Sequence, residues 1–328
     1  MISSLTTALL SKMQPVFGDT KVKIGVAGAC CVAALYALHR HVYWRKRVKS
    51  FDNQVVVVTG AASGMGRALA LRFAKWGSRL ALLDVNKGGL EETKKMIEAL
   101  TLPKGGAPKP CKTFVCDVSK SEKCVATLKD VRSQMGDEID VLINNAGVIV
   151  GKEIVDLTDA DIAFTFGVNT FGPMYMTRAV LPSMMKRKKG HIVFMASAAG
   201  FTGVAKMSDY SASKAACQKF AESVREEVRF HKMYDIHVTQ INPYFVRTGM
   251  FVGVKDTFIL PMLSTDFVVD QTLQGIIDRV PRVNTPFMVR LSIFLKSFMP
   301  MFFLDGLKWA LRVDVTMEDF KPPSRPTK

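Results

Sequence analysis

The chain has 328 residues, of which 48% are hydrophobic, and its formal net charge is +16. This composition argues against a disordered protein and allows one large folded core with an appended segment. The basic charge comes without zinc-finger spacing or an aromatic RNA-binding motif, and the 6 cysteines contain no C-x-x-C pair, so we expect no nucleic-acid partner and no metal site.

Residues 1–50 are predicted to be a membrane anchor with a basic flank. An uncharged run of 15 residues, Ile24 to Leu38, precedes Tyr43 and Trp44, which suit a membrane interface. The basic residues 45–49 favour contact with anionic lipid headgroups and place the following domain in the cytosol. We expect a signal anchor or a helix lying on the membrane. A cleaved signal peptide and a buried core helix are the alternatives.

Residues 51–280 show an alternation of apolar strand patterns and helical patterns. The first strand pattern, "NQVVVVTG", is continuously apolar, as parallel strands covered on both faces require. The predicted strands cover residues 53–60, 79–84, 112–118, 141–147, 191–197 and 236–243. This alternation predicts a single α/β domain, a doubly wound parallel sheet of the Rossmann type.

A glycine-rich loop lies between the first strand and the first helix. Glycines allow the backbone to turn tightly and bring its N–H groups to a pyrophosphate at the helix N-terminus. Asp84 ends the second strand, where its carboxylate could bind the ribose hydroxyls of NAD and repel the 2′-phosphate of NADP. We therefore predict NAD as the cofactor, with NADP less favoured although Lys87 lies nearby. The cofactor-binding residues predicted in the loop are Thr59, Gly60, Ser63, Gly64, Met65 and Gly66.

Three motifs in this order resemble the classical short-chain dehydrogenase/reductase family. They are T-G-x-x-x-G-x-G at 59–66, N-N-A-G at 144–147 and Y-x-x-x-K at 210–214. The resemblance implies further cofactor contacts from Asp117, Val118, Asn144, Ala146, Gly147, Tyr210, Lys214, Pro243 and Thr248. Tyr244 stands where the family usually has glycine. The turn "PYFVRTG" is similar to the family's membrane-anchored branch of microsomal retinol and hydroxysteroid dehydrogenases, which implies the endoplasmic reticulum or a lipid droplet.

The resemblance also implies a catalytic set of Asn169, Ser197, Tyr210 and Lys214. A free tyrosine has a pKa near ~10, so its phenolate needs stabilisation to act as a base at neutral pH. Lys214 lies four residues after Tyr210 on the same helix face, and its ammonium is expected to lower the Tyr210 pKa. Ser197 and Tyr210 would hold the substrate oxygen, while Asn169 would keep a water in the proton path.

Apolar residues follow the last predicted strand and suggest a lid over a lipophilic substrate. They are Tyr244, Phe245, Phe251, Phe258, Ile259, Leu260, Met262, Leu263 and Phe267. We predict that residues 281–320 form an apolar segment that contacts the membrane or roofs the substrate entrance, with self-association or core packing as alternatives. The tail, residues 321–328, is predicted to be disordered.

These expectations define an NAD-dependent oxidoreductase for a lipophilic alcohol or carbonyl, such as retinol, a hydroxysteroid or a long-chain alcohol. One alternative is an NADPH-dependent ketoreductase of lipid synthesis. Another is a nucleotide-binding membrane scaffold without catalysis, although all four catalytic positions are filled. Assembly into a homo-oligomer remains open.

Overall fold

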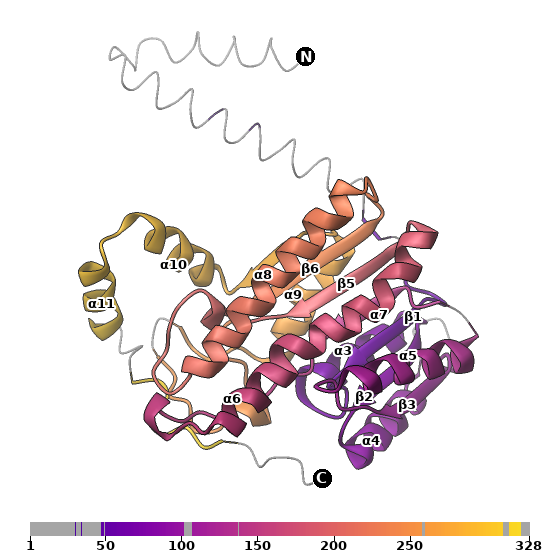
Figure 1. The fold of residues 1–328 in the computed structure, drawn as a ribbon, viewed down its shortest axis with the longest axis horizontal. Helices are drawn as coiled ribbons and strands as arrows, with labels where there is room; N and C mark the ends of the chain where they lie inside the picture. The colour runs from indigo at the N-terminus through magenta and orange to yellow at the C-terminus, as the bar shows by residue number, and fades with distance from the viewer. Residues whose placement is uncertain are drawn as a thin grey trace. The chain divides into compact units, whose positions relative to one another are not determined.

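The computed structural model describes residues 30, 34, 47–48, 50–101, 107–136, 138–257, 260–310 and 315–322 (Figure 1). The chain divides into two units, Met1–Arg47 and Val48–Lys328. The predicted membrane segment falls in the first unit and lies outside the described residues except Cys30 and Ala34, whose backbone is helical. Among the residues that the structure describes, no helix combines the length and apolar character needed to cross a bilayer.

The second unit is built on one sheet of 7 strands, all paired in parallel. The order across the sheet is β3-β2-β1-β4-β5-β6-β7. Strands β2 and β3 are added on one side of β1 and strands β4 to β7 on the other, so the strand order has its reversal between β1 and β4. Ligands of open α/β sheets bind at the carboxyl ends of the strands at such a reversal. The strands are β1 (Val55–Thr59), β2 (Arg79–Asp84), β3 (Cys111–Val115), β4 (Val141–Asn144), β5 (Gly190–Met195), β6 (Ile236–Pro243) and β7 (Arg282–Thr285).

Helices cover both faces of this sheet. The helices α3 (Gly64–Lys75), α4 (Lys87–Glu98) and α9 (Thr265–Ile277) pack on one face, and α5 (Ser121–Met135), α7 (Gly172–Arg187) and α8 (Ser208–Phe230) pack on the other. Successive side chains of a strand point to opposite faces, so Val55 and Val57 of β1 enter one core while Val56 and Val58 enter the other. This explains why the strand sequence is continuously apolar.

The predicted doubly wound parallel sheet is confirmed, and each of the 6 predicted strands is present. The pattern missed β7, an edge strand of 4 residues that pairs only with β6 through Gln240↔Arg282 to Pro243↔Thr285. Its sequence, "RVNT", has a single apolar residue, and the more exposed Arg282 and Asn284 alternate with the buried Val283 and Thr285. The sheet therefore continues beyond residue 280, where we expected the catalytic domain to end.

Shorter elements lie near the carboxyl ends of the strands. They are the 3₁₀ helices η1 (Ile154–Asp156), η3 (Ala198–Gly200) and η4 (Gly249–Phe251), the helix α6 (Asp159–Phe166) and the π-helix η2 (Gly167–Phe171) that joins α6 to α7. After β7, α10 (Phe287–Phe298) and α11 (Met301–Ala310) extend outside the layers of sheet and helices (Figure 1).

Candidate active site

The four predicted catalytic residues converge from three elements and are all buried. Ser197 follows β5 and starts η3, Tyr210 and Lys214 lie near the start of α8, and Asn169 lies in η2. The start of α8 is held by Asp209, whose carboxylate accepts a hydrogen bond from Thr165 Oγ1 at 2.6 Å. The structure thus brings together side chains that are up to 45 residues apart in the sequence.

The side chain of Ser197 acts on the ionisation of Tyr210. Burial raises the pKa of Tyr210 to about 12, and Ser197 opposes this rise. The net shift of the Tyr210 pKa is upward because the loss of hydration outweighs the opposing effect of Ser197. Ser197 itself is oriented by the Ala199 N–H, which donates to Ser197 Oγ at 3.1 Å.

Lys214 lies between the end of β5 and the N-N-A-G turn. Its Nζ donates to the main-chain oxygen of Met195 at 2.9 Å and lies 5.7 Å from the centre of the Tyr210 ring. Burial lowers the pKa of Lys214. A Cβ at Gly147 would be 3.3 Å from Lys214 Nζ and 3.5 Å from Asn169 Oδ1, so glycine allows both polar groups to lie close to the N-N-A-G turn.

Asn169 links the end of β4 to the catalytic helix. Its amide nitrogen donates to Val148 O at 2.9 Å and Ser213 Oγ at 3.0 Å, and its oxygen accepts from Val148 N at 2.8 Å. Ser213 Oγ in turn donates to Tyr210 O at 2.7 Å. Asn169 is buried within the π-helix η2, and π-helical turns are frequent at functional sites.

The glycine loop has the shape that a pyrophosphate site needs. Gly60 and Gly64 have φ angles of +67° and +52°, and a Cβ at Gly66 would lie 2.0 Å from Gly60 O. Ser63 precedes α3 without capping it, so the first N–H groups of this helix face an exposed loop. A dinucleotide phosphate fits this cradle, in which side chains larger than glycine would fill the space.

Asn145 is a functional residue that the sequence reasoning missed. Its Nδ2 donates to Thr59 O at 2.9 Å and to Gly60 O at 3.3 Å, which ties the glycine loop to the end of β4. The signal was present in the second asparagine of N-N-A-G. However, only the neighbouring strand shows which main-chain oxygens this side chain reaches.

Three predicted cofactor residues use their side chains within the fold. Thr59 Oγ1 donates to Ile143 O and accepts from the N–H groups of Asn145 and Ala146, the last two at 3.0 Å. Asn144 donates to Thr177 Oγ1 at 3.4 Å, and Met65 packs against the core on the α3 side.

The predicted adenosine-side residues lie at the carboxyl ends of β2 and β3. The Asp84 carboxylate accepts from Ala62 N at 3.1 Å and Asn86 N at 3.0 Å, and the Asp117 carboxylate accepts from Ser119 N and Oγ. Val118 is buried beside Gly172. Both carboxylates are thus held in place by neighbouring N–H groups and keep free lone pairs.

At the end of β6, the chain turns at Pro243 and comes back to the glycine loop. Thr248 caps η4 through Met250 N at 3.3 Å, and its side chain lies 3.7 Å from the position of a Cβ at Gly64. Thr248 is therefore close enough to the loop to share one ligand with it. Tyr244, which replaces the expected glycine, donates its N–H to Thr285 O of β7 at 2.9 Å.

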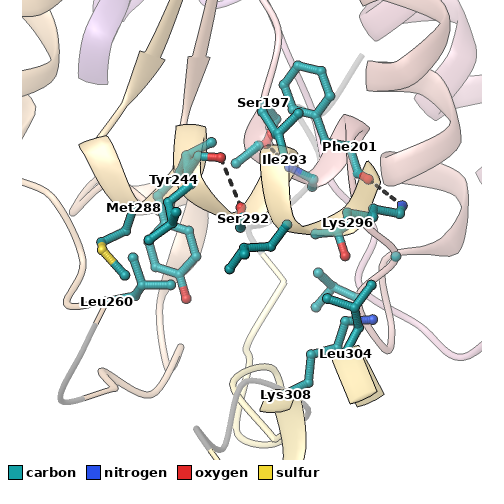
Figure 2. Close-up of a pocket in the computed structure, with 18 of the residues that line it drawn as sticks. Ser197, Phe201, Tyr244, Leu260, Met288, Ser292, Ile293, Lys296, Leu304 and Lys308 are labelled. Carbon is teal, nitrogen blue, oxygen red and sulfur yellow. Dashed lines mark hydrogen bonds between the residues drawn. The ribbon is translucent and has the colours of Figure 1, made fainter. Parts of the chain in front are cut away.

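A cavity of about 410 Å³ adjoins Ser197. Its walls are mostly apolar and come from the loop after β5, from Tyr244, Phe245, Phe251 and Leu260, and from α10 and α11. In Figure 2, Ser197 lies beside Phe201 and Ile293 at one end of the cavity, with Leu304 and Lys308 of α11 at the other end. The predicted lid residues Phe258 and Ile259 lie outside the described residues.

Gln218 binds the main chain of Ser197 and was not among the residues predicted from the sequence. Its Nε2 donates to Ser197 O at 2.7 Å and to Asn242 Oδ1 at 3.0 Å. Asn242 Nδ2 continues the network to Asn284 Oδ1 of β7 at 2.7 Å. Gln218 lies four residues after Lys214 on the same face of α8, which was a usable signal, but its partner strand β7 had not been predicted.

Comparisons with known proteins agree with this geometry. Residues 54–257 match the family model of the short chain dehydrogenases. Epidermal retinol dehydrogenase 2 of Homo sapiens is 37% identical over 255 residues, covering 77% of this chain and 80% of that protein. Estradiol 17-beta-dehydrogenase 11 of Macaca fascicularis is 34% identical, covering 87% of this chain and 90% of that protein.

Solved structures show the same fold with a bound nicotinamide dinucleotide. A short chain dehydrogenase/reductase from Burkholderia phymatum in complex with NAD superposes with a TM-score of 0.67 at 25% identity, covering 86% of this chain and all of that chain. NAD⁺-bound xylitol dehydrogenase superposes with a TM-score of 0.54 at 32% identity, covering 60% of this chain and 72% of that chain.

Proposed function

The chain belongs to the short chain dehydrogenase family, and from this premise we propose an NAD-dependent oxidoreductase that transfers hydride between nicotinamide and a lipophilic alcohol or carbonyl at a membrane surface. The observation that carries the proposal is the position of Ser197. Its side chain lowers the pKa of Tyr210, and Ser197 also lines the apolar cavity of about 410 Å³. A substrate whose oxygen is held there would place this oxygen near the Tyr210 hydroxyl, while the apolar part of the substrate fills the cavity.

In the direction of oxidation, Tyr210 accepts the hydroxyl proton of the substrate, and Ser197 orients the substrate oxygen. Bound NAD would accept the hydride, and its positive nicotinamide would favour the phenolate form of Tyr210. Lys214 would reach the nicotinamide ribose and contribute a second positive charge. Lys214 Nζ and Asn169 Oδ1, which both lie near Gly147, would hold a water that carries the proton onward.

NAD is favoured over NADP by the carboxylate of Asp84. The Ala62 and Asn86 N–H groups hold this carboxylate beside the glycine loop, where its free lone pairs could accept the hydroxyls of the adenine ribose. A 2′-phosphate would meet the same negative charge. Asp117, Val118, Gly147, Pro243 and Thr248 complete the proposed cofactor contacts, and the NAD complexes of related dehydrogenases support this assignment.

The lining of the cavity favours a lipophilic substrate. Apolar side chains from α10, α11 and the turn after β6 form most of its wall, which would bind an extended or polycyclic hydrocarbon body. Relatives named for retinol and estradiol support alcohols of this kind. Retinol, hydroxysteroids and long-chain alcohols are therefore the substrate candidates.

The membrane part of the proposal depends on α10 and α11 together with residues 1–50. These helices expose large apolar side chains, including Phe287 at 70%, Phe298 at 74%, Phe302 at 78% and Trp309 at 75%. Arg290, Lys296 and Lys308 accompany them, a mixture typical of a surface that rests on anionic lipid. We propose that α10 and α11 lie on the bilayer and that residues 24–38 anchor the protein to the endoplasmic reticulum or a lipid droplet, with the catalytic domain in the cytosol.

The decisive experiment assays the purified full chain in detergent with NAD and NADP against retinol, hydroxysteroids and long-chain alcohols. We expect oxidation with NAD and higher kcat/KM than with NADP. A clear preference for NADPH in the direction of reduction would favour the ketoreductase alternative. Nucleotide binding without turnover of any alcohol would favour the scaffold.

The membrane proposal is tested by carbonate extraction of membranes from cells that express the full chain. We expect the protein to stay with the membranes. Release into the supernatant would contradict an anchor at residues 24–38.

A further inference from the structure

The segment after α11 returns to the carboxyl edge of the sheet. We call residues 315–322 the C-terminal strap. Thr316 and Met317 are each 1% exposed, and Lys321 N donates to Val252 O at 2.9 Å, so the ordered chain reaches into the tail predicted to be disordered. This segment is therefore packed against the domain, although it was grouped by sequence with a membrane-contact region.

The strap pairs with residues 251–255, the last residue of η4 and the loop after it. From here on we use the name lid for this part of the segment predicted to cover the substrate. Besides the bond from Lys321 to Val252, Lys255 N donates to Thr316 O at 3.0 Å. Lys255 Nζ also lies 2.6 Å from Glu318 Oε2 and 3.1 Å from Asp319 Oδ2, but these groups are exposed and the pairs contribute little. The two main-chain hydrogen bonds do not depend on the side chains of the residues that form them. They require that the strap and the lid approach each other closely.

Two glycines make this close approach possible. Gly253 has φ +82°, and a Cβ there would lie 2.1 Å from Asp319 O. Gly151, in the loop after β4, has φ +72°, and a Cβ there would lie 2.1 Å from Phe320 Cε1. The loop before α8 joins the same contact, because Lys206 Nζ donates to Glu318 O at 3.2 Å. The strap thus contacts the loops that follow β4, β5 and β6.

The strap and the lid continue inward to the catalytic tyrosine. Met317 belongs to one buried apolar cluster with Tyr210, Phe245 and Met207. Phe251 of the lid packs its ring edge-to-face with Tyr210, at 6.3 Å between centroids, and with Phe245 at 5.1 Å. Phe245 and Phe251 also line the cavity beside Ser197.

We propose that the C-terminal strap is a positioning element: Met317 and the main-chain pairing with the lid hold Phe251 against Tyr210 and thereby set the shape of the alcohol site. This inference rests on the proposed function, since it concerns the same cavity. It assigns residues 315–322 to the substrate site and removes them from the segment proposed to contact the membrane.

The test compares Gly253→Ala with Gly249→Ala, a control at which an added Cβ meets no atom within 4 Å. For Gly253→Ala we expect a fall of roughly tenfold or more in kcat/KM for the alcohol, since misplacement by about 1 Å can cost ~10²-fold. The KM for NAD should stay unchanged, because the strap does not touch the glycine loop. The control should stay within about twofold of the wild type, as surface changes usually do.

Hydrogen exchange of the Lys255 and Lys321 amides provides a readout that is independent of turnover. Faster exchange in Gly253→Ala together with an unchanged kcat/KM would overturn the proposal. If Gly253→Ala fails to fold, Met317→Ala and Met317→Leu provide the test. A lower kcat/KM for the alcohol in Met317→Ala and a recovered kcat/KM in Met317→Leu support the proposed role of the strap. Wild-type kinetics in Met317→Ala refute it. A wild-type enzyme that oxidises no alcohol would instead refute the proposed function, and the exchange measurement would still test the strap.

Discussion

Lys214 and Tyr210 share one face of α8, yet Lys214 Nζ donates to the main-chain oxygen of Met195 and lies 5.7 Å from the centre of the Tyr210 ring. Burial acts on the two groups in opposite senses, because it disfavours the charged form of each. It raises the pKa of Tyr210 to about 12 and lowers that of Lys214. The tyrosine therefore keeps its proton at neutral pH until further positive charge enters the site.

Replacement of Tyr210 by Phe should abolish turnover and leave NAD binding near normal. The ring would still fill the apolar cluster around Met207 and Phe245, but the proton acceptor would be gone. A general acid–base group contributes about 10²–10⁴-fold in rate, so we expect a loss of that size. Steady-state kinetics and NAD titration by fluorescence measure the two effects, and substantial residual activity would refute the assigned role.

The pH profile of oxidation should report the effect of Ser197 on the pKa of Tyr210. Oxidation needs the phenolate, so kcat/KM should rise with pH toward the alkaline pKa of Tyr210. Because Ser197 lowers this pKa, Ser197→Ala should move the rising limb to higher pH in addition to lowering the rate. The measurement is kcat/KM from pH 6 to 11, within the range in which the enzyme stays folded. A limb that does not move would show that Ser197 does not stabilise the phenolate.

Gln218 should position Ser197 without contacting the substrate. Gln218→Met keeps the approximate volume but removes the hydrogen bonds to Ser197 O and Asn242 Oδ1. We expect kcat to fall by roughly tenfold or more through displacement of Ser197, with an unchanged KM for NAD. Gln274→Met, at an exposed position of α9, is the matched control. Equal kinetics of the two variants would contradict a positioning role for Gln218.

The glycine loop should not tolerate a side chain at Gly66. In Gly66→Ala the added methyl would lie 2.0 Å from Gly60 O, so the loop must open and the phosphate cradle is lost. We expect the Kd for NAD to rise by roughly tenfold or more, which corresponds to ~1.4 kcal/mol of lost binding free energy. Gly306→Ala, where an added Cβ meets nothing within 4 Å, should bind NAD normally. Calorimetric titration checks both variants.

His191 should make the stability of the domain depend on pH. Its pKa is lowered well below its usual value, mainly by burial and further by His237 and Arg279, and its ring lies 5.6 Å from that of His237. The folded state therefore stays unprotonated while the unfolded state takes up a proton as the pH falls below about 6.5, so the free energy of unfolding decreases there.

Thermal unfolding between pH 5 and 8 measures this dependence. The contribution of His191 should approach ~1.4 kcal/mol per pH unit below pH 6, and His191→Gln should have a flatter profile than the wild type. His231→Gln, at an exposed residue at the end of α8, is the control and should keep the wild-type profile. A Tm that is equally pH-dependent in His191→Gln would assign the effect to other groups.

Much of the site could be predicted because its chemistry lies in short motifs. The spacing from Tyr210 to Lys214 places both on one helix face, and the glycines at 60, 64 and 66 reflect local backbone requirements. Residues such as Asn145 and Gln218 were missed because their roles depend on partners from other strands. The effect of burial on the pKa of Tyr210 was not anticipated, since burial depends on the whole surrounding fold rather than on one neighbouring charge.

The sequence by itself determined the parallel α/β sheet and the membership of the short chain dehydrogenase family, because periodicity and motif spacing are local properties of the chain. Tertiary structure alone decided that β7 extends the sheet, that α10 and α11 enclose the cavity beside Ser197, and that Met317 returns to the cluster around Tyr210. These features join residues that are more than 100 positions apart in several cases, as with Met317 and Tyr210. Their contacts follow from packing of the complete chain and have no signature in any short stretch of it.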